Sequence, residues 1–292
     1  MASFVIHNLA GEEFLNTIQN KLGVSLTQEE KNIFLMGNLI VDSTKPVPSI
    51  PEGLSPSELK KAKLERKINT QKEKNSTHFR DPNESDLTIQ TPKVERFIQK
   101  YDSLFSKDIS VLGYLFHLYT DVIFFKDLFI KTFTCLDSNG NPTIYYSQTS
   151  SLELKKDGKR YPAIDVFSND SEVSIYQDYT KMNALFLNLF PTTFDYDTLV
   201  SFIPNFINPG IEEVDYANIL SVLNKTSQFI KESYSLTDYT LKVFDENIVK
   251  SFISEVISSF IEQYKELILK SIHPKKEPSL LKRYPSNDNK TS

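Results

Sequence analysis

The sequence predicts an all-α protein, in which several helices form a bundle around one buried central helix. Apolar residues recur at helical spacing in several segments, most regularly over residues 245–272. Residues 108–133 are apolar on nearly every side, as expected of a helix that is surrounded by others. Only 8 of the 292 residues are Gly, which disfavours glycine-rich nucleotide-binding folds and β-sandwiches with many tight turns.

The first expected helices begin at recognisable signals. Residues 12–21 have apolar side chains at helical spacing. Thr27 and Glu30 form a capping box, in which each side chain satisfies a backbone N–H at the helix start. We therefore expect a second helix that runs from this box to about residue 39.

A charged excursion, either a loop or a solvated flap, is predicted over residues 43–90. Three Pro residues within 46–51 require a loop at its start. Ser55 and Glu58 form a second capping box with Pro at the first helical position, which predicts a helix to about residue 67.

The rest of the chain is expected to continue as helices with one irregular region. The elements expected in chain order are a helix over 91–105, the central helix over 108–133, a turn at 137–142, a short hairpin or ordered loop over 145–166, and helices over 171–190 and 245–272. We interpret residues 1–273 as one helical domain and residues 274–292 as a polar, disordered tail.

Composition excludes several classes of function. With 33 Lys and Arg against 38 Asp and Glu, the net charge is −5, which argues against a nucleic-acid partner bound through phosphate neutralisation. Cys135 is the single cysteine, so a disulfide framework and a Cys-based zinc site are excluded. Any metal ion must therefore be held by the four His residues and by carboxylates.

The sequence also indicates a cytoplasmic protein without an integral membrane segment. The N-terminus lacks the basic and apolar regions of a signal peptide. Residues 109–125 approach the length of a membrane span but contain His117 and Asp121. An Asp near the middle of a bilayer costs about 3 kcal/mol, so we interpret this segment as a buried helix.

His117 and Asp121 are the first pair that could support chemistry. Residues four apart lie on the same face of a helix, so the imidazole and the carboxylate project together. A buried carboxylate needs a cation, a set of hydrogen-bond donors or a metal ion. A simple His–Asp hydrogen bond inside the core is the alternative interpretation.

Together with other segments, this pair makes the chain resemble the zinc-dependent phospholipase C family, in particular its cytoplasmic bacterial relatives of uncertain substrate. The matching segments, which cover roughly residues 1–190, are Phe4-Val-Ile-His7, Met36-Gly-Asn-Leu-Ile-Val-Asp42, Thr77-His78-Phe-Arg80, Gly113-Tyr-Leu-Phe-His117-Leu-Tyr-Thr-Asp121 and, more weakly, Ile175-Tyr-Gln-Asp178. The resemblance implies a multi-helix bundle of the phospholipase C/P1 nuclease type.

The resemblance also implies a set of site residues and a cofactor. The metal ligands it implies are His7, His78, His117 and Asp121, with Asp42 as a further ligand or as the base that handles the attacking water. Arg80 is expected either to contact a substrate phosphate or to form a structural salt bridge. Asp178 is expected either to be a ligand or to make a buried hydrogen bond. The expected cofactor is one or two Zn²⁺ ions, with Mn²⁺ or Fe²⁺ as alternatives.

The sequence thus predicts a metal-dependent hydrolase, with a phosphoester in a small-molecule or lipid-like substrate as the first choice. Zn²⁺ held by imidazoles and carboxylates lowers the pKa of bound water and so supplies a nucleophile at neutral pH. One alternative is the same metal site acting on an ester, an amide or a biosynthetic intermediate. Another is a non-catalytic binding protein on the same fold, since no His lies between His117 and His273 to complete a three-zinc site. The oligomeric state is not set by the sequence.

Overall fold

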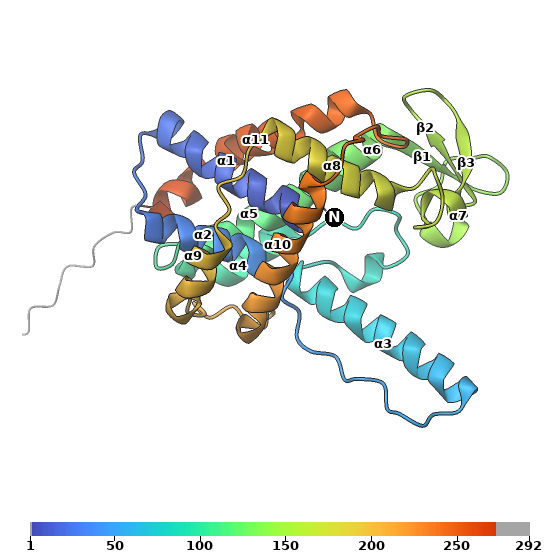
Figure 1. Ribbon diagram of the computed structural model, residues 1–292, viewed down its shortest axis with the longest axis horizontal. Coiled ribbons are helices and arrows are strands. Elements are labelled where there is room, and N and C mark those ends of the chain that lie inside the picture. The colour runs from blue at the N-terminus through green and yellow to red at the C-terminus, as the bar shows by residue number, and fades with distance from the viewer. Residues whose placement is uncertain (1, 273–292) are drawn as a thin grey trace, which may run out of the picture.

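The computed structural model describes residues 2–272 and is predominantly helical, which confirms the predicted class (Figure 1). The helices are α1 (Phe4–Leu22), α2 (Gln28–Ile40), α3 (Pro56–Thr77), α4 (Val94–Tyr101), α5 (Ser110–Ile123), α6 (Ile130–Thr132), α7 (Ala163–Val166), α8 (Ile175–Leu189), α9 (Tyr196–Phe202), α10 (Ile219–Tyr234) and α11 (Glu246–Ile272). The predicted tail over 274–292 lies outside the described residues.

Helix α5 is the central helix and is buried from Ser110 to Val122. It packs against α1, α2, α4 and α11. A π-helix, Phe124–Phe129, joins it to α6, so the helix predicted over 108–133 exists but contains one wider turn. Such turns are rare and often lie next to functional sites. Here the wider turn positions Phe125 beneath the guanidinium of Arg80, 5.5 Å from the ring centroid.

Helices α2 and α5 approach each other closely because each carries a glycine at the contact. A Cβ atom on Gly113 would overlap the backbone of Phe34, and one on Gly37 would overlap the backbone of Ser110. This close approach brings the carbonyl of Asn38 within 2.7 Å of His117 Nδ1. The two glycines therefore help to set the position of His117.

The substitution Gly113→Ala tests this close contact. Ala is about 1 kcal/mol better than Gly in a helix, whereas overpacking costs about 1–3 kcal/mol. Because the obstacle is backbone, which cannot rotate away, we expect an overpacking cost at the upper end of this range, about 3 kcal/mol. After subtraction of the gain in helix propensity, the free energy of unfolding in urea should fall by about 2 kcal/mol. An unchanged or higher stability would show that α2 and α5 are not held this closely.

A small sheet stands beside the helices in the described part of the chain. Strands β1 (Phe133–Leu136), β2 (Ser151–Leu154) and β3 (Arg160–Pro162) are antiparallel in the order β1-β2-β3. The hairpin expected within 145–166 corresponds to β2 and β3. The all-α prediction missed the pairing of β1 with β2, in which Cys135 lies opposite Leu152.

Two helices extend beyond their predicted bounds, and both extensions affect the site. Helix α1 begins at Phe4 because the hydroxyl of Ser3 accepts a hydrogen bond from the backbone N–H of Ile6. His7 therefore lies inside the first helix and not before it. Helix α3 begins at the predicted capping box but continues to Thr77. It projects away from the other helices (Figure 1). Its C-terminal end meets the body of the protein and places His78 there.

The segment 191–244, for which the sequence analysis predicted no element, contributes α9 and α10. Helix α10 packs against α1, α2 and α8. Among residues 2–272, no helix combines the length and the apolar character needed to cross a membrane.

Candidate metal centre

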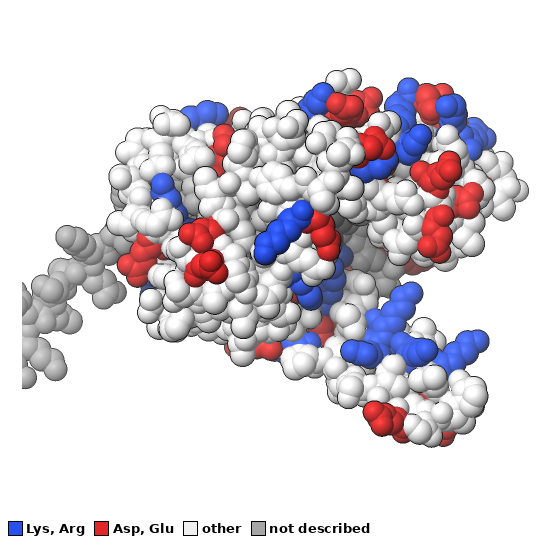
Figure 2. All heavy atoms as spheres, in the orientation of Figure 1, with Lys and Arg blue, Asp and Glu red and all other residues white. Residues whose placement is uncertain are grey.

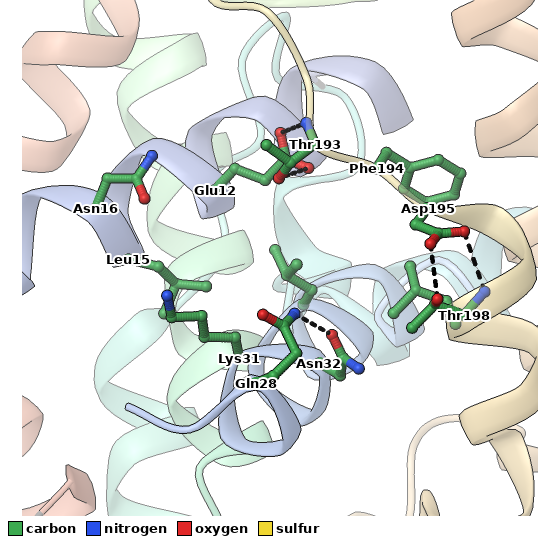
Figure 3. A pocket seen from close by; sticks show the side chains of 12 residues that line it. Glu12, Leu15, Asn16, Gln28, Lys31, Asn32, Thr193, Phe194, Asp195 and Thr198 are labelled. Atoms are coloured by element: carbon green, nitrogen blue, oxygen red, sulfur yellow. Dashed lines mark hydrogen bonds between the residues drawn. The ribbon is translucent and has the colours of Figure 1, made fainter. Parts of the chain in front are cut away.

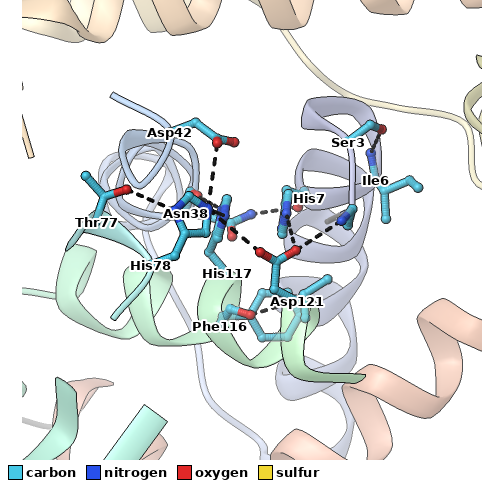
Figure 4. A network of polar contacts seen from close by, with 12 residues as sticks. Ser3, Ile6, His7, Asn38, Asp42, Thr77, His78, Phe116, His117 and Asp121 are labelled. Carbon is cyan, nitrogen blue, oxygen red and sulfur yellow. Dashed lines mark hydrogen bonds and ion pairs between the residues drawn. The ribbon is translucent and has the colours of Figure 1, made fainter. Parts of the chain in front are cut away.

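Five of the six predicted metal ligands meet in one place, where three helices and the residue after α3 converge (Figure 4). His7 comes from α1, Asp42 follows α2, His78 caps the end of α3, and His117 and Asp121 lie one turn apart on α5. Their donor atoms form two groups, within each of which all atoms lie within 4.8 Å of one another. The two groups are His7 with His117 and Asp121, and Asp42 with His78 and His117.

The two groups share His117 and are almost completely removed from solvent. The side chains of His78, His117 and Asp121 are 0% exposed and that of His7 is 1% exposed, whereas Asp42 is 10% exposed. The centre is therefore buried, and Asp42 lies at the side of it that solvent can reach.

Backbone carbonyls fix the orientation of two imidazoles. Nδ1 of His117 lies 2.7 Å from the carbonyl of Asn38, and Nδ1 of His78 lies 2.9 Å from the carbonyl of Lys74. A carbonyl only accepts, so each Nδ1 carries the proton and each Nε2 presents a lone pair. The two Nε2 atoms face each other at 3.4 Å. With both protons on Nδ1, the two Nε2 atoms cannot hydrogen-bond to each other, and a cation bound between them would satisfy both.

The separations match the edge of a tetrahedral metal site. Bonds of about 2.1 Å at the tetrahedral angle place neighbouring ligand atoms about 3.4 Å apart. The distance from His117 Nε2 to His78 Nε2 is 3.4 Å, and that from His7 Nε2 to Asp121 Oδ1 is also 3.4 Å. His78 Nε2 lies 3.7 Å from Asp42 Oδ1 and 3.7 Å from Asp121 Oδ2. The donor set could therefore hold a divalent metal ion.

Buried polar atoms without hydrogen-bond partners among residues 2–272 concentrate at this centre. They include both ring nitrogens of His7, Nε and Nη2 of Arg80, and Oδ2 of Asp121. Leaving such a group unpaired costs about 1–3 kcal/mol. Such a concentration is typical of side chains that surround a bound group.

Burial and neighbouring charges hold the centre in the protonation state that a metal needs. Burial lowers the pKa of His78 to about 4, and burial together with His7 lowers the pKa of His117 well below its usual value. Burial would raise the pKa of Asp121, but the neighbouring imidazoles of His7 and His78 lower it well below its usual value. At neutral pH the imidazoles of His78 and His117 are therefore neutral and Asp121 is ionised, which is the ligand form of each.

The protonation state of Asp42, at the edge of the centre, is also set by burial and by neighbouring charges. Burial raises the pKa of its carboxyl group, whereas the Coulombic attraction of His117, Lys74 and His78 lowers it, and the net shift is downward. Asp42 is thus a carboxylate at neutral pH, next to the imidazole of His78.

A strained turn places Arg80 beside the centre. Phe79 has a φ of 52°, in the left-handed region that a bulky residue rarely adopts. Its ring is held among Phe97, Tyr101 and Tyr114. The turn lets Arg80 point back toward α5, where its Nη2 lies 3.7 Å from Asp121 Oδ2. Strain of this kind costs about 1–3 kcal/mol and is retained where the surrounding packing enforces it.

Asp178 is not brought into the cluster. Its carboxylate accepts three backbone hydrogen bonds, from the N–H groups of Lys242, Val243 and Phe244 at 2.9, 2.7 and 3.0 Å. The side chain is 1% exposed. Of the two expectations for this residue, the structure therefore shows the buried hydrogen bond, which ties α8 to the segment before α11.

Replacement of Asp178 by Ala separates a structural role from metal binding. Three backbone N–H groups lose their acceptor, so we expect the free energy of unfolding to fall by about 2–4 kcal/mol. We expect the metal content of the folded variant to remain that of the wild type. Asp170→Ala, at an exposed carboxylate, is the control and should change stability by less than about 0.5 kcal/mol. Loss of metal from a still folded Asp178→Ala protein would contradict this assignment.

Sequence reasoning missed Asn38, which supports two of the histidines. Its carbonyl accepts the proton of His117 Nδ1, and its side-chain Nδ2 donates to the carbonyl of His7 at 2.6 Å. Asn38 is 0% exposed. The signal was present in the sequence, since Asn38 lies one turn before Asp42 inside an apolar helix, where a polar side chain needs a partner.

A separate cavity of about 410 Å³ lies between α1, α2 and the segment that leads into α9 (Figure 3). It is lined by polar side chains that include Glu12, Lys31 and Asp195. Both carboxylate oxygens of Glu12 already accept hydrogen bonds from Thr192 and Thr193. None of the six predicted metal ligands lines this cavity, so it is distinct from the centre.

Comparisons with protein-family models, with curated proteins and with solved structures each gave no match to the chain.

Proposed function

We propose that the protein is a metal-dependent hydrolase that cleaves a phosphoester, with a helical bundle of the phospholipase C/P1 nuclease type as its scaffold. One or two divalent ions, Zn²⁺ first and Mn²⁺ or Fe²⁺ as alternatives, would be held by donors from the set His7, Asp42, His78, His117 and Asp121. Because Nδ1 of His117 is bonded to the carbonyl of Asn38, its Nε2 would serve one ion only. The observation that carries the proposal is the pair of buried donor groups that share His117, with two Nε2 lone pairs facing each other at 3.4 Å.

The surrounding side chains fit a hydrolytic reaction. A divalent ion in such a site lowers the pKa of bound water toward neutrality and offsets negative charge on a phosphoryl group. Asp42 is ionised and is the one member of the centre that reaches solvent, so it can accept a proton from the attacking water. Arg80 has unpaired N–H groups next to Asp121 and can donate to a phosphoryl oxygen.

Arg80 is also the reason to rank a phosphoester above the alternatives. A buried guanidinium that lacks a full set of partners favours an anionic group, and a neutral ester or amide would not supply one. Hydrolysis of a non-phosphate bond and a purely structural metal site are the competing proposals.

The test is turnover of bis(p-nitrophenyl) phosphate and of p-nitrophenyl acetate by protein stripped with EDTA and then reloaded with Zn²⁺, Mn²⁺ or Fe²⁺. We expect metal-dependent cleavage of the phosphodiester, and at least about a hundredfold loss in Asp42→Asn if Asp42 is the general base. Asp165→Asn, at a carboxylate of α7 outside the centre, serves as control. Cleavage of the acetate alone would favour the non-phosphate alternative, and bound metal with no turnover of either compound would favour a structural site.

A further inference from the structure

Helix α3 is a positively charged arm on a negatively charged protein. Its 22 residues contain seven Lys and Arg and three Glu, a net charge of 7 − 3 = +4 in a chain whose total is −5. The arm stands out from the helical body (Figure 1), and its side chains between Lys63 and Gln71 are exposed. Figure 2 shows Lys and Arg side chains gathered on the side of α3 that faces a hollow in the molecular surface.

Four cations of α3 line one groove. Lys63, Arg66, Lys67 and Lys74 line a cavity of about 510 Å³ between α3 and the preceding loop, together with Ile50, Thr70 and Gln71. No acidic side chain lines the groove. Within residues 2–272, none of the four cations forms an ion pair, although Lys61 on the other side of α3 pairs with Glu65.

Three of these cations form a row along one face of α3. Lys63, Lys67 and Lys74 lie four and seven residues apart and so follow one face of the helix. At a rise of 1.5 Å per residue, the row extends over about 16 Å. Like charges four residues apart repel each other, so the arrangement is relieved by an anionic partner with several charges.

The row leads to the metal centre. The carbonyl of Lys74 holds Nδ1 of His78 at 2.9 Å. Lys74 lies one turn before His78, whose Nε2 is 3.7 Å from Asp42 Oδ1. Arg80 and the donor groups lie beyond this end of α3.

We propose that this groove binds an extended ligand with a row of phosphate groups, and that this ligand is the substrate of the metal centre. The inference rests on the proposed function and specifies its substrate class. The terminal phosphates lie along Lys63, Arg66 and Lys67, and the ester to be cleaved lies at the Arg80 end. In the reaction the oxygen of water bonds to phosphorus, the ester P–O bond breaks, and the leaving oxygen takes up a proton.

The first experiment measures binding of inorganic tripolyphosphate to the full chain by calorimetry in 50 mM salt with EDTA, so that no metal contributes. We expect Lys63→Gln/Lys67→Gln to weaken binding at least tenfold. The matched control is Lys61→Gln/Lys72→Gln, which removes the same charge from the opposite side of α3 and should weaken binding less than twofold. We also expect binding to weaken steeply between 50 and 200 mM salt, since it depends on charge neutralisation.

The outcomes separate this inference from the proposed function. Suppose that bis(p-nitrophenyl) phosphate is cleaved in a metal-dependent way, but tripolyphosphate does not bind or the two double variants weaken its binding equally. This result would refute phosphate binding in the groove and would leave the proposed hydrolase activity standing. Selective tripolyphosphate binding without any metal-dependent turnover would overturn the assignment of this ligand as substrate. Cosedimentation with phosphatidylserine vesicles that depends on Lys61 and Lys72, and not on Lys63 and Lys67, would show that α3 docks on an anionic membrane instead.

Discussion

Replacement of His117 by Ala is expected to remove metal from the centre, because His117 belongs to both candidate donor groups. Even residues that only orient a ligand contribute about 10–100-fold to metal affinity, so loss of a shared ligand should weaken zinc binding by at least about a hundredfold. Turnover of the phosphodiester should fall to background. Elemental analysis of the purified variant and a zinc titration with a competing chelator measure the two effects.

Three further variants show whether the loss of metal in His117→Ala comes from the loss of this ligand. His7→Ala should weaken only the group with Asp121, and Asp42→Ala only the group with His78, so each should retain part of the metal. Tyr119→Phe is the control for α5, since Tyr119 packs against Phe260 and Tyr264 on the side of α11 and away from the centre. A folded His117→Ala protein with its full metal content would refute the assignment of the centre.

The local features of this fold were predictable from short sequence signals. Both capping boxes begin helices where expected, because their hydrogen bonds span only three residues. The spacing of His117 and Asp121 was equally informative, because residues four apart lie on the same face of a helix. The start of α1 was missed because Ser3 caps a helix with no acidic residue in its first turn, and the end of α3 was missed because its polar run has no apolar period.

The features that depend on distant segments could not be predicted from such signals. Asp178 finds its donors 64 to 66 residues further along the chain, and a buried Asp on an apolar face is equally compatible with a ligand and with a cap. The approach of His7 and His78 to the mid-chain pair was expected from the resemblance alone. In the structure it depends on the close packing of α2 on α5 and on the strained turn at Phe79.

The metal-free protein should lose stability steeply in mild acid, because folding buries neutral imidazoles that take up protons when the chain unfolds. The pKa of His78 is about 4 in the folded protein and 6.5 without the fold. Between these values the unfolded state binds more protons, so stability is complete above pH 6.5 and falls as the pH drops toward 4. This difference between the two pKa values means that His78 contributes about 3 kcal/mol to the loss in the free energy of unfolding. The lowered pKa of His117 acts in the same direction.

Urea unfolding with EDTA at pH 7 and at pH 4.5 measures this loss, and His78→Gln should show a shallower pH dependence because it lacks the titrating group. Bound zinc should steepen the acid transition of the wild-type protein, since protons compete with the metal for the same Nε2 atoms. Equal stability of the metal-free wild type at the two pH values would mean that the imidazoles of His78 and His117 are not buried in their neutral form. The lone pairs that face each other at 3.4 Å would then no longer support a cation between them, so this experiment tests the electrostatic basis of the centre without relying on any substrate.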